Sequence, residues 1–192
     1  MNKEFTRELI RLAGILLAVT LIVGAALGAV NGVTIDRIAA VKAQKTQDAM
    51  SAIIPNCTFE RVEYTGDSDL IREIYAAKDA SGTYMGLCVK VAPTGFSGEV
   101  GTIVGITPDN KVIGVEVVES TETAQLGSKA GEKSWNSQYN GKGGPFVVVK
   151  SRAAGENDIV AISGATITSS AVTRGVQAAV DFAVSYNAEV GK

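Results

Sequence analysis

Residues 98–120 read GEVGTIVGITPDNKVIGVEVVES, two runs of alternating side chains on either side of Pro108-Asp109-Asn110. Alternation with period two predicts β-strands that bury one face, and Pro, Asp and Asn together are typical of a turn. The stretch therefore predicts an antiparallel hairpin with strands at 100–107 and 111–119. An antiparallel sheet is the first element of the predicted fold.

The strand pattern continues on both sides of this hairpin. Further candidate strands lie at 59–64, 71–77, 84–91 and 145–150, with a short apolar strand at 159–162. A helix is predicted over 168–187, where one face collects the apolar residues Val172, Val176, Ala179, Val180 and Ala183. Strands grouped with flanking helices predict an α+β domain. The polar stretch 121–144, which holds Trp135, is predicted to be a functional loop or short helices.

The N-terminal part of the chain has a different composition. The 19 residues from Leu12 to Val30 contain one polar side chain, Thr20. As a helix they would cover about 28 Å, close to the roughly 30 Å of a bilayer core. A cleaved signal peptide is the alternative, but its apolar region is usually about 7–15 residues long, which favours an uncleaved anchor. Three Lys or Arg residues lie near each end, so charge favours an N-in orientation only slightly.

Residues 34–54 place apolar side chains among Lys and Gln. This pattern predicts a helix leading from the membrane surface into the domain, with Thr34 as its N-cap and Pro55 after its end. The chain is therefore predicted to have three parts. They are a membrane anchor over 1–33, a connecting helix over 34–55 and a single domain over 56–192.

The composition excludes several kinds of chemistry. The chain has no histidine, which rules out Ser-His-Asp and Cys-His catalytic units and removes the commonest transition-metal ligand. Cys57 and Cys88 lie 31 positions apart without CxxC spacing, so no metal site is predicted. They could pair outside the cytoplasm, or Cys88 could be a core residue of a strand. A net charge of −2 argues against a protein that binds nucleic-acid phosphates.

The entrance to the last helix is the strongest candidate site. Residues 162–170 read ISGATITSS and follow a short apolar strand. The first turn of a helix has free N–H groups and a positive dipole end, so it binds phosphate well, and Gly164 allows a ligand to approach closely. Plain helix capping by Ser and Thr explains the same composition. Two other clusters, GFSG at 95–98 and ETAQLG at 122–127, are interpreted from the residues alone as a turn and a polar loop.

In this order and spacing, with one N-terminal anchor, these three clusters resemble the family of G subunits of the Rnf electron-transport complex. That family is related to the C subunit of the sodium-pumping NADH:quinone oxidoreductase, and both carry an FMN-binding domain. The resemblance implies an FMN joined through its phosphate to the hydroxyl of Thr166, with Thr168 as the nearby alternative. It also implies cofactor contacts from Ser163, Gly164, Ala165, Glu122, Thr123, Leu126, Gly127, Gly95, Phe96, Ser97 and Gly98.

The resemblance further implies a membrane-anchored flavoprotein subunit without catalytic residues of its own, whose domain lies on the extracytoplasmic side of the cell membrane. Its complex would pass electrons between ferredoxin and NAD⁺ and move Na⁺ or H⁺. The implied partners are the membrane subunits, the flavin-carrying D subunit and the iron–sulfur subunits, with a flavin transferase for maturation. The alternatives are the sodium-pump C subunit, an anchored module without cofactor, and a free-standing extracytoplasmic flavoprotein.

Two positions depart from the family's usual pattern. The family usually has an aspartate three residues before the serine of the attachment motif, where this chain has Val160. The family loop usually reads Glu-Thr-Pro-Gly-Leu-Gly, and this chain has Ala124 and Gln125 in place of Pro and Gly. The first departure concerns recognition by the flavin transferase. The second concerns the backbone shape beside the flavin ring.

Overall fold

The computed structural model describes residues 3–64, 66–152 and 155–190, and the chain forms two compact units, 1–44 and 45–192. Most of helix α1 (Lys3–Ile53) makes up the first unit, and by length and composition this helix could cross a membrane. The predicted break at Thr34 is wrong. The Thr34 hydroxyl donates to the carbonyl of Val30 at 2.9 Å, one turn back, so it does not cap a new helix. With no proline before Pro55, nothing in the sequence stops the helix earlier.

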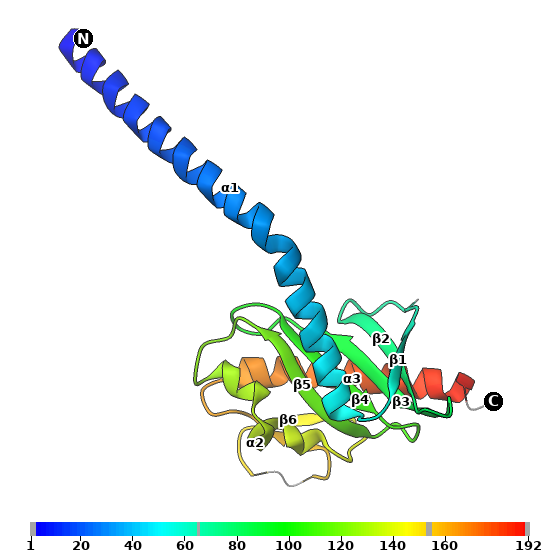
Figure 1. Cartoon of the computed structure of the whole chain (residues 1–192). Helices are drawn as coiled ribbons and strands as arrows, with labels where there is room; N and C mark the ends of the chain where they lie inside the picture. Colours follow the sequence, from blue (N-terminus) through cyan, green and yellow to red (C-terminus); the bar gives the residue numbers. More distant parts are fainter. Residues whose placement is uncertain (1–2, 65, 153–154, 191–192) are drawn as a thin grey trace. The chain divides into compact units, whose positions relative to one another are not determined.

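The second unit contains a five-stranded sheet, which confirms the predicted α+β class (Figure 1). Its strands lie in chain order and each pairs antiparallel with the next: β1 (Thr58–Val62), β2 (Ile71–Lys78), β3 (Tyr84–Val91), β4 (Val100–Ile106) and β5 (Val112–Ser120). The predicted hairpin is β4–β5. Its turn is closed by the Thr107 N–H, which donates to the Lys111 carbonyl at 2.8 Å, and Asn110 takes the left-handed φ of +62°. Both features are typical of an Asn-containing tight turn.

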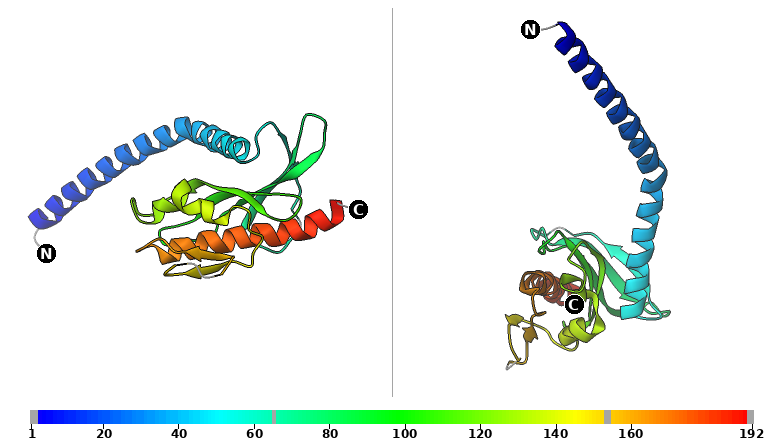
Figure 2. Two further views of the ribbon diagram at one scale, coloured as in Figure 1. Left: turned by 90° about the horizontal axis from the view of Figure 1, so that it is seen from below. Right: turned by 90° about the vertical axis from the view of Figure 1, so that its left-hand side faces the viewer.

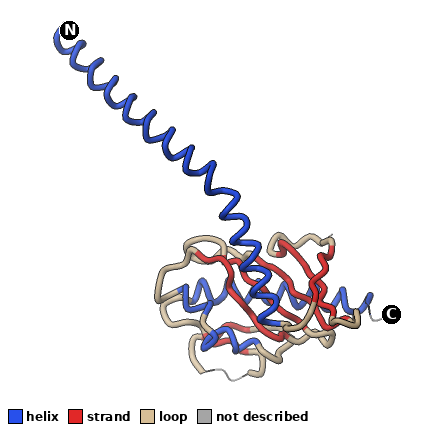
Figure 3. The backbone as a smooth tube through the Cα atoms, viewed as in Figure 1, coloured by secondary structure: helices blue, strands red, loops and turns tan. Residues whose placement is uncertain are grey.

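The two faces of the sheet are covered by different helices (Figure 2). Helix α3 (Thr166–Val190) packs on one face, where alternate strand residues such as Leu87, Val89 and Val104 form the larger core with Val176. The opposite face buries Cys88 and Ile103 beneath Met50 and Ile53 of the last turns of α1, which belong to the second unit, and beneath Ile54, the residue after the helix. In Figure 3 the strands of this sheet lie together within the second unit.

A separate parallel pair, β6 (Val147–Val149) and β7 (Asp158–Val160), lies against α3 and forms its own two-stranded sheet. The candidate strand at 145–150 thus joins no main-sheet strand. Phe146 packs its ring on Tyr139 at 5.4 Å, and its N–H donates to Gln177 Oε1 on α3 at 2.9 Å. These contacts hold β6 against α3.

The polar stretch 121–144 contains three short helical segments, in agreement with one of the two predictions for it. They are η1 (Gly127–Gly131), α2 (Lys133–Asn136) and η2 (Ser137–Tyr139). Trp135, 8% exposed, lies in α2, and its indole N–H donates to the carbonyl of Val160 at 2.7 Å. This bond anchors the end of β7, immediately before the turn that leads into α3.

Both cysteines are free thiols in the structure. Cys88 is fully buried in β3, as the prediction of a core residue requires, and Cys57 is half-buried beside the same cluster. Burial raises the pKa of the Cys88 thiol to about 12. The thiol therefore stays protonated near neutral pH and packs as an apolar side chain.

Candidate functional site

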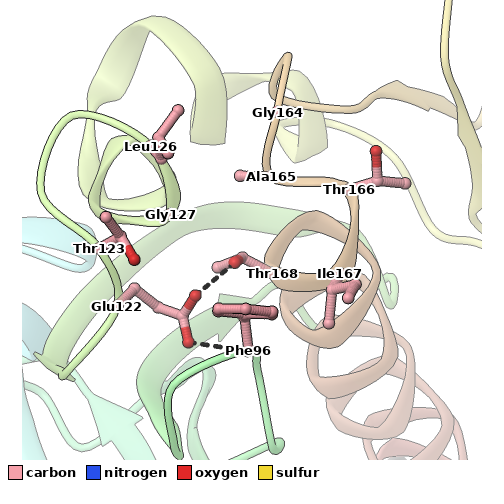
Figure 4. A pocket seen from close by; sticks show the side chains of 10 residues that line it. All are labelled: Phe96, Glu122, Thr123, Leu126, Gly127, Gly164, Ala165, Thr166, Ile167 and Thr168. Carbon is pink, nitrogen blue, oxygen red and sulfur yellow. Dashed lines mark hydrogen bonds between the residues drawn. The ribbon is translucent and has the colours of Figure 1, made fainter.

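A cleft of about 400 Å³ opens at the N-terminal end of α3 (Figure 4). This volume lies within the range of roughly 300–1,000 Å³ that is typical of small-molecule sites. Its lining brings together residues that are up to 72 positions apart in the sequence: Phe96, Glu122, Thr123, Leu126, Gly127, Gly164, Ala165, Thr166, Ile167 and Thr168. Nine of these ten belong to the predicted site. We name residues 164–168 the helix wall and residues 122–127 the loop wall.

The helix wall is held by a buried ladder of hydroxyl groups. The Ala165 N–H donates to the Ile162 carbonyl at 2.9 Å across a turn in which Gly164 takes φ +79°. The buried Ser169 Oγ accepts from the Ile162 N–H and donates to the Ala165 carbonyl, each at 2.9 Å. The next rung is Thr173, which donates to the Ser169 carbonyl at 2.8 Å. These bonds fix the angle at which α3 begins.

The loop wall is shaped by bonds from its own backbone. The carbonyl of Thr123 accepts from the N–H groups of Leu126 and Ser128, both at 3.2 Å. The Gln125 N–H donates to Ser128 Oγ at 2.9 Å, and Gln125 takes a left-handed φ of +61°. The family that this chain resembles usually has glycine at the position of Gln125. The loop therefore keeps a backbone conformation that favours glycine although the residue is glutamine.

Glu122 connects the two walls and the loop at 95–98. Its Oε1 accepts from the backbone N–H groups of Phe96 and Ser97, both at 2.9 Å. Its Oε2 accepts from the Thr168 hydroxyl at 2.5 Å. A Cβ on Gly127 would lie 2.5 Å from Glu122 Oε2, and one on Gly95 would lie 2.6 Å from Oε1. The two glycines therefore allow both loops to close on the carboxylate.

The two candidate attachment residues have opposite environments. Thr168 is 1% exposed, and its hydroxyl is committed to Glu122. Thr166, the first residue of α3, is half-buried in the cleft lining, and within the described ranges its hydroxyl has no hydrogen-bond partner. In Figure 4 the Thr166 side chain points away from Glu122 and the Thr168 side chain points toward it.

The remaining predicted residues, Gly95, Ser97, Gly98 and Ser163, are not part of the lining. Ser97 supplies an N–H to Glu122, and Gly95 donates its N–H to the Gly98 carbonyl at 2.7 Å, which closes the turn. Ser163 is an exposed residue of the turn before α3. Whether these residues contact a cofactor stays a prediction.

Ile167 also lines the cleft, and the sequence analysis did not predict it. The sequence does indicate its exposure, because Ile167 lies outside the helix face of Val172 and Val176 and is not part of the core.

The mouth of the cleft is apolar. Phe96 is 70% exposed, Ile167 55% and Leu126 43%. Exposed side chains of this size are informative when they converge on one cleft. With a free hydroxyl and the N–H groups of a helix start beside them, they suit a ligand that has a flat apolar body and an anionic tail.

Comparison with known protein families places the cleft inside a recognised domain. The model of the FMN-binding domain family matches residues 95–181, a range that begins at the Phe96 loop and includes both walls of the cleft.

Two curated relatives resemble the chain over most of its length. The first is the G subunit of the Na⁺-translocating ferredoxin:NAD⁺ oxidoreductase complex of Acetobacterium woodii, 35% identical, with 86% of this chain and 87% of the relative covered. The second is the G subunit of the proton-translocating ferredoxin:NAD⁺ oxidoreductase complex of Clostridium ljungdahlii, 32% identical, with 75% of each chain covered.

A solved structure shares the fold. The C subunit of the Na⁺-translocating NADH-quinone reductase from Parabacteroides distasonis superposes with a TM-score of 0.52 at 21% identity, over 67% of this chain and 72% of the other. At this identity the likeness shows the fold alone.

Proposed function

This chain belongs to the family of G subunits of Rnf-type ion-translocating oxidoreductase complexes and carries an FMN-binding domain, and we propose on this basis that it relays electrons within such a complex through an FMN held in the cleft at the start of α3. The family membership confirms the resemblance that the three clusters carry. The specific site, the attachment and the partners are the content of the proposal.

The residues of the cleft fit this cofactor. The exposed side chains of Phe96, Ile167 and Leu126 would cover the faces of an isoalloxazine ring. Because positions 127 and 95 are glycines, no side chain at either position collides with Glu122 or projects into the cleft. The start of α3 offers unpaired N–H groups and a positive dipole end to the phosphate. A shape with an apolar mouth and a polar helix start matches the two ends of FMN.

We propose that the FMN phosphate is esterified to Oγ1 of Thr166. The observation that carries this assignment is the contrast between the two threonines. The Thr168 hydroxyl is buried and bonded to Glu122, whereas Thr166 is a half-buried lining residue whose hydroxyl has no partner in the described ranges. The resemblance to the family's attachment motif, SGAT at 163–166, supports the same residue. Ser163, Gly164 and Ala165 would shape the turn beside the phosphate.

Bound FMN can accept and return electrons, and the protein contributes position and environment. The hydroxyl ladder of Ser169 and Thr173 holds the helix start in place. Apolar side chains at the mouth would shield the bound ring from water. No side chain of this chain needs to exchange a proton for such a relay, which is compatible with the absence of histidine.

The experiment is to express the full chain with a flavin transferase and to replace Thr166 with Val, which keeps the side-chain shape and removes the hydroxyl. The denatured wild-type chain should show flavin fluorescence in a gel, and Thr166→Val should be dark. The wild-type mass should exceed that of the sequence by FMN less one water, as an ester requires. Thr166→Ser, which keeps a hydroxyl, should remain fluorescent.

Thr168→Val is the matched control, and its denatured band should stay fluorescent. A fluorescent Thr166→Val band together with a dark Thr168→Val band would move the attachment to Thr168. A wild-type mass equal to the sequence mass would contradict covalent FMN and favour the alternative of an anchored module without cofactor.

We further propose that the complex connects ferredoxin and NAD⁺, as the names of both relatives state for theirs. The partners would be the membrane subunits, the flavin-carrying D subunit and the iron–sulfur subunits. Inverted vesicles that carry the complex with Thr166→Val should lose ferredoxin-dependent NAD⁺ reduction, and undiminished reduction would contradict the relay. The relatives' names differ in the ion, Na⁺ in one and the proton in the other. Sodium dependence of the wild-type activity distinguishes the two.

We propose that residues 1–33 anchor the chain in the cell membrane and that the domain lies on the extracytoplasmic side. The length and apolar composition of α1 support the anchor. The resemblance to the Rnf G subunits supports the extracytoplasmic position of the domain. Protease added to right-side-out vesicles should degrade the domain, and a protected domain would contradict this orientation.

A further inference from the structure

The carboxylate of Glu122 lies at the meeting point of three segments, 26 residues from Phe96 and 46 from Thr168 along the chain. Each of its three bonds in the structure comes from a neutral donor: the N–H groups of Phe96 and Ser97 and the hydroxyl of Thr168. An ionised carboxylate only accepts hydrogen bonds, so this donor set suits the charged form.

The charge of Glu122 has no cationic partner in the described ranges 3–64, 66–152 and 155–190. The three hydrogen bonds hold the carboxylate between the two loops, and a side chain larger than hydrogen at position 95 or 127 would collide with it. The half-buried carboxylate is thus a fixed negative charge in the lining of the cleft. Charges at such sites are screened less by solvent than those on an open surface.

We propose that Glu122 is a positioning residue that joins the helix wall to the loop wall, and that its charge lowers the reduction potential of the flavin in the cleft. This inference rests on the proposed function, because it requires FMN in this cleft. Reduction adds negative charge to a flavin, so a fixed negative charge beside it disfavours the reduced form. The same bonds that close the cleft therefore also set the electrostatic environment of the cofactor.

The test is a potentiometric titration of the full chain, flavin attached, as wild type and as Glu122→Gln. Glutamine keeps the shape and one acceptor oxygen for the two backbone N–H groups, and its amide can donate to Thr168, so the walls stay joined. Loss of the charge should make two-electron reduction about tenfold more favourable, a rise of about 30 mV in the midpoint potential. Glu189→Gln, with the same charge change near the C-terminal end of α3, should leave the midpoint unchanged.

Thr168→Val provides the complementary variant, because it keeps the charge and removes one donor. Its midpoint should lie at or below that of the wild type, since the carboxylate is less compensated. A rise in Thr168→Val would overturn the proposal even if Glu122→Gln could not be loaded with flavin. A Glu122→Gln midpoint equal to the wild type would also overturn it.

The two proposals fail in different ways. A wild-type chain without attached flavin contradicts the proposed function before any potential is measured. A wild-type chain with attached flavin and a midpoint that does not respond to Glu122→Gln contradicts only the role of Glu122. A purely structural role for Glu122 would change the melting temperature but not the midpoint.

Discussion

The helix wall and the loop wall enclose the same cleft but are stabilised differently. The helix wall begins a 25-residue helix and rests on buried groups: Ser169 is 0% exposed, Tyr139 0% and Trp135 8%. The loop wall is mostly exposed, depends on local backbone bonds and contains the left-handed residue Gln125. The comparison indicates that the wall carrying Thr166, the proposed attachment residue, is the rigid one and that the opposite wall is the adaptable one.

This difference predicts that substitutions behind the helix wall destabilise the domain far more than those in the loop wall. Rigid, buried elements hold functional groups more accurately than loops do. A loop that depends on local bonds opens at lower free energy, which would let a flavin enter during attachment.

The largest effect is expected from Trp135→Ala. Trp135 packs edge-on against Tyr139 at 5.7 Å and bonds to the Val160 carbonyl. Removing a buried aromatic side chain of this size should lower the free energy of unfolding by about 3–5 kcal/mol. Leu126→Ala in the loop wall, 43% exposed, should cost less than about 1 kcal/mol. Urea denaturation of both variants measures the contrast, and equal losses would contradict the proposed difference between the walls.

Ser169→Ala should have the next largest effect. It removes the acceptor of the Ile162 N–H and the donor to the Ala165 carbonyl in a fully buried place. A buried N–H without a partner costs about 1–3 kcal/mol. Ser170→Ala, at the neighbouring half-buried position, should change the free energy of unfolding by less than about 0.5 kcal/mol. If the two alanine variants unfold at the same urea concentration, the ladder does not stabilise the helix wall.

Tyr139→Phe should cost about 0.5–1.5 kcal/mol at neutral pH, because the phenol shares a hydrogen bond of 2.7 Å with Thr173. Burial raises the pKa of Tyr139, an effect that its bond to Thr173 partly opposes. The folded state therefore keeps this proton at a pH where the unfolded state has lost it. The resulting stability is fully present below about pH 10, the unfolded pKa, and is lost as pH rises above it.

The alkaline contribution can be measured by thermal unfolding at several values between about pH 8 and pH 11, a range that brackets the unfolded pKa. The wild-type melting temperature should fall more steeply above about pH 10 than that of Tyr139→Phe, because the variant has no phenol at this position. Burial also raises the pKa of Tyr84, so the variant should still lose some stability. Parallel curves for the two proteins would contradict the assignment to Tyr139.

Much of the sheet could be predicted from the sequence, because strand alternation and turn composition are local signals. The hairpin around Asn110 shows this, since its strands and its turn lie where the pattern places them. The start of α3 at Thr166 was placed two residues late, because small and β-branched residues do not distinguish a loop from a first helical turn. The partner of β6 could not be predicted, since three residues carry no pairing information.

The start of α3 was identified as a candidate site by physical pattern, whereas the two loops of the cleft were identified by resemblance alone. Alone, residues 95–98 and 122–127 have the composition of a turn and a polar loop. The bond from Thr168 to Glu122 spans 46 residues, and no local pattern indicates it. The fold brings both side chains to one point, so the connecting role of Glu122 is visible only in three dimensions.

The smallest effect is expected at the position where the loop wall departs from its family. Gln125 holds a left-handed φ of +61°, which costs an L-residue about 1–2 kcal/mol. Gln125→Gly should relieve this and, after the greater entropy of an unfolded glycine is subtracted, raise the free energy of unfolding by about 0.5–1 kcal/mol. Ala124, next to it and also exposed, does not have a positive φ. Ala124→Gly should therefore lower the free energy of unfolding by a similar amount. Urea denaturation measures the change in the free energy of unfolding for both variants. Changes of opposite sign would mean that glutamine destabilises the domain at position 125 because the backbone there has the conformation that glycine favours. Changes of the same sign in the two variants would mean that the loop wall has a different backbone from the one described.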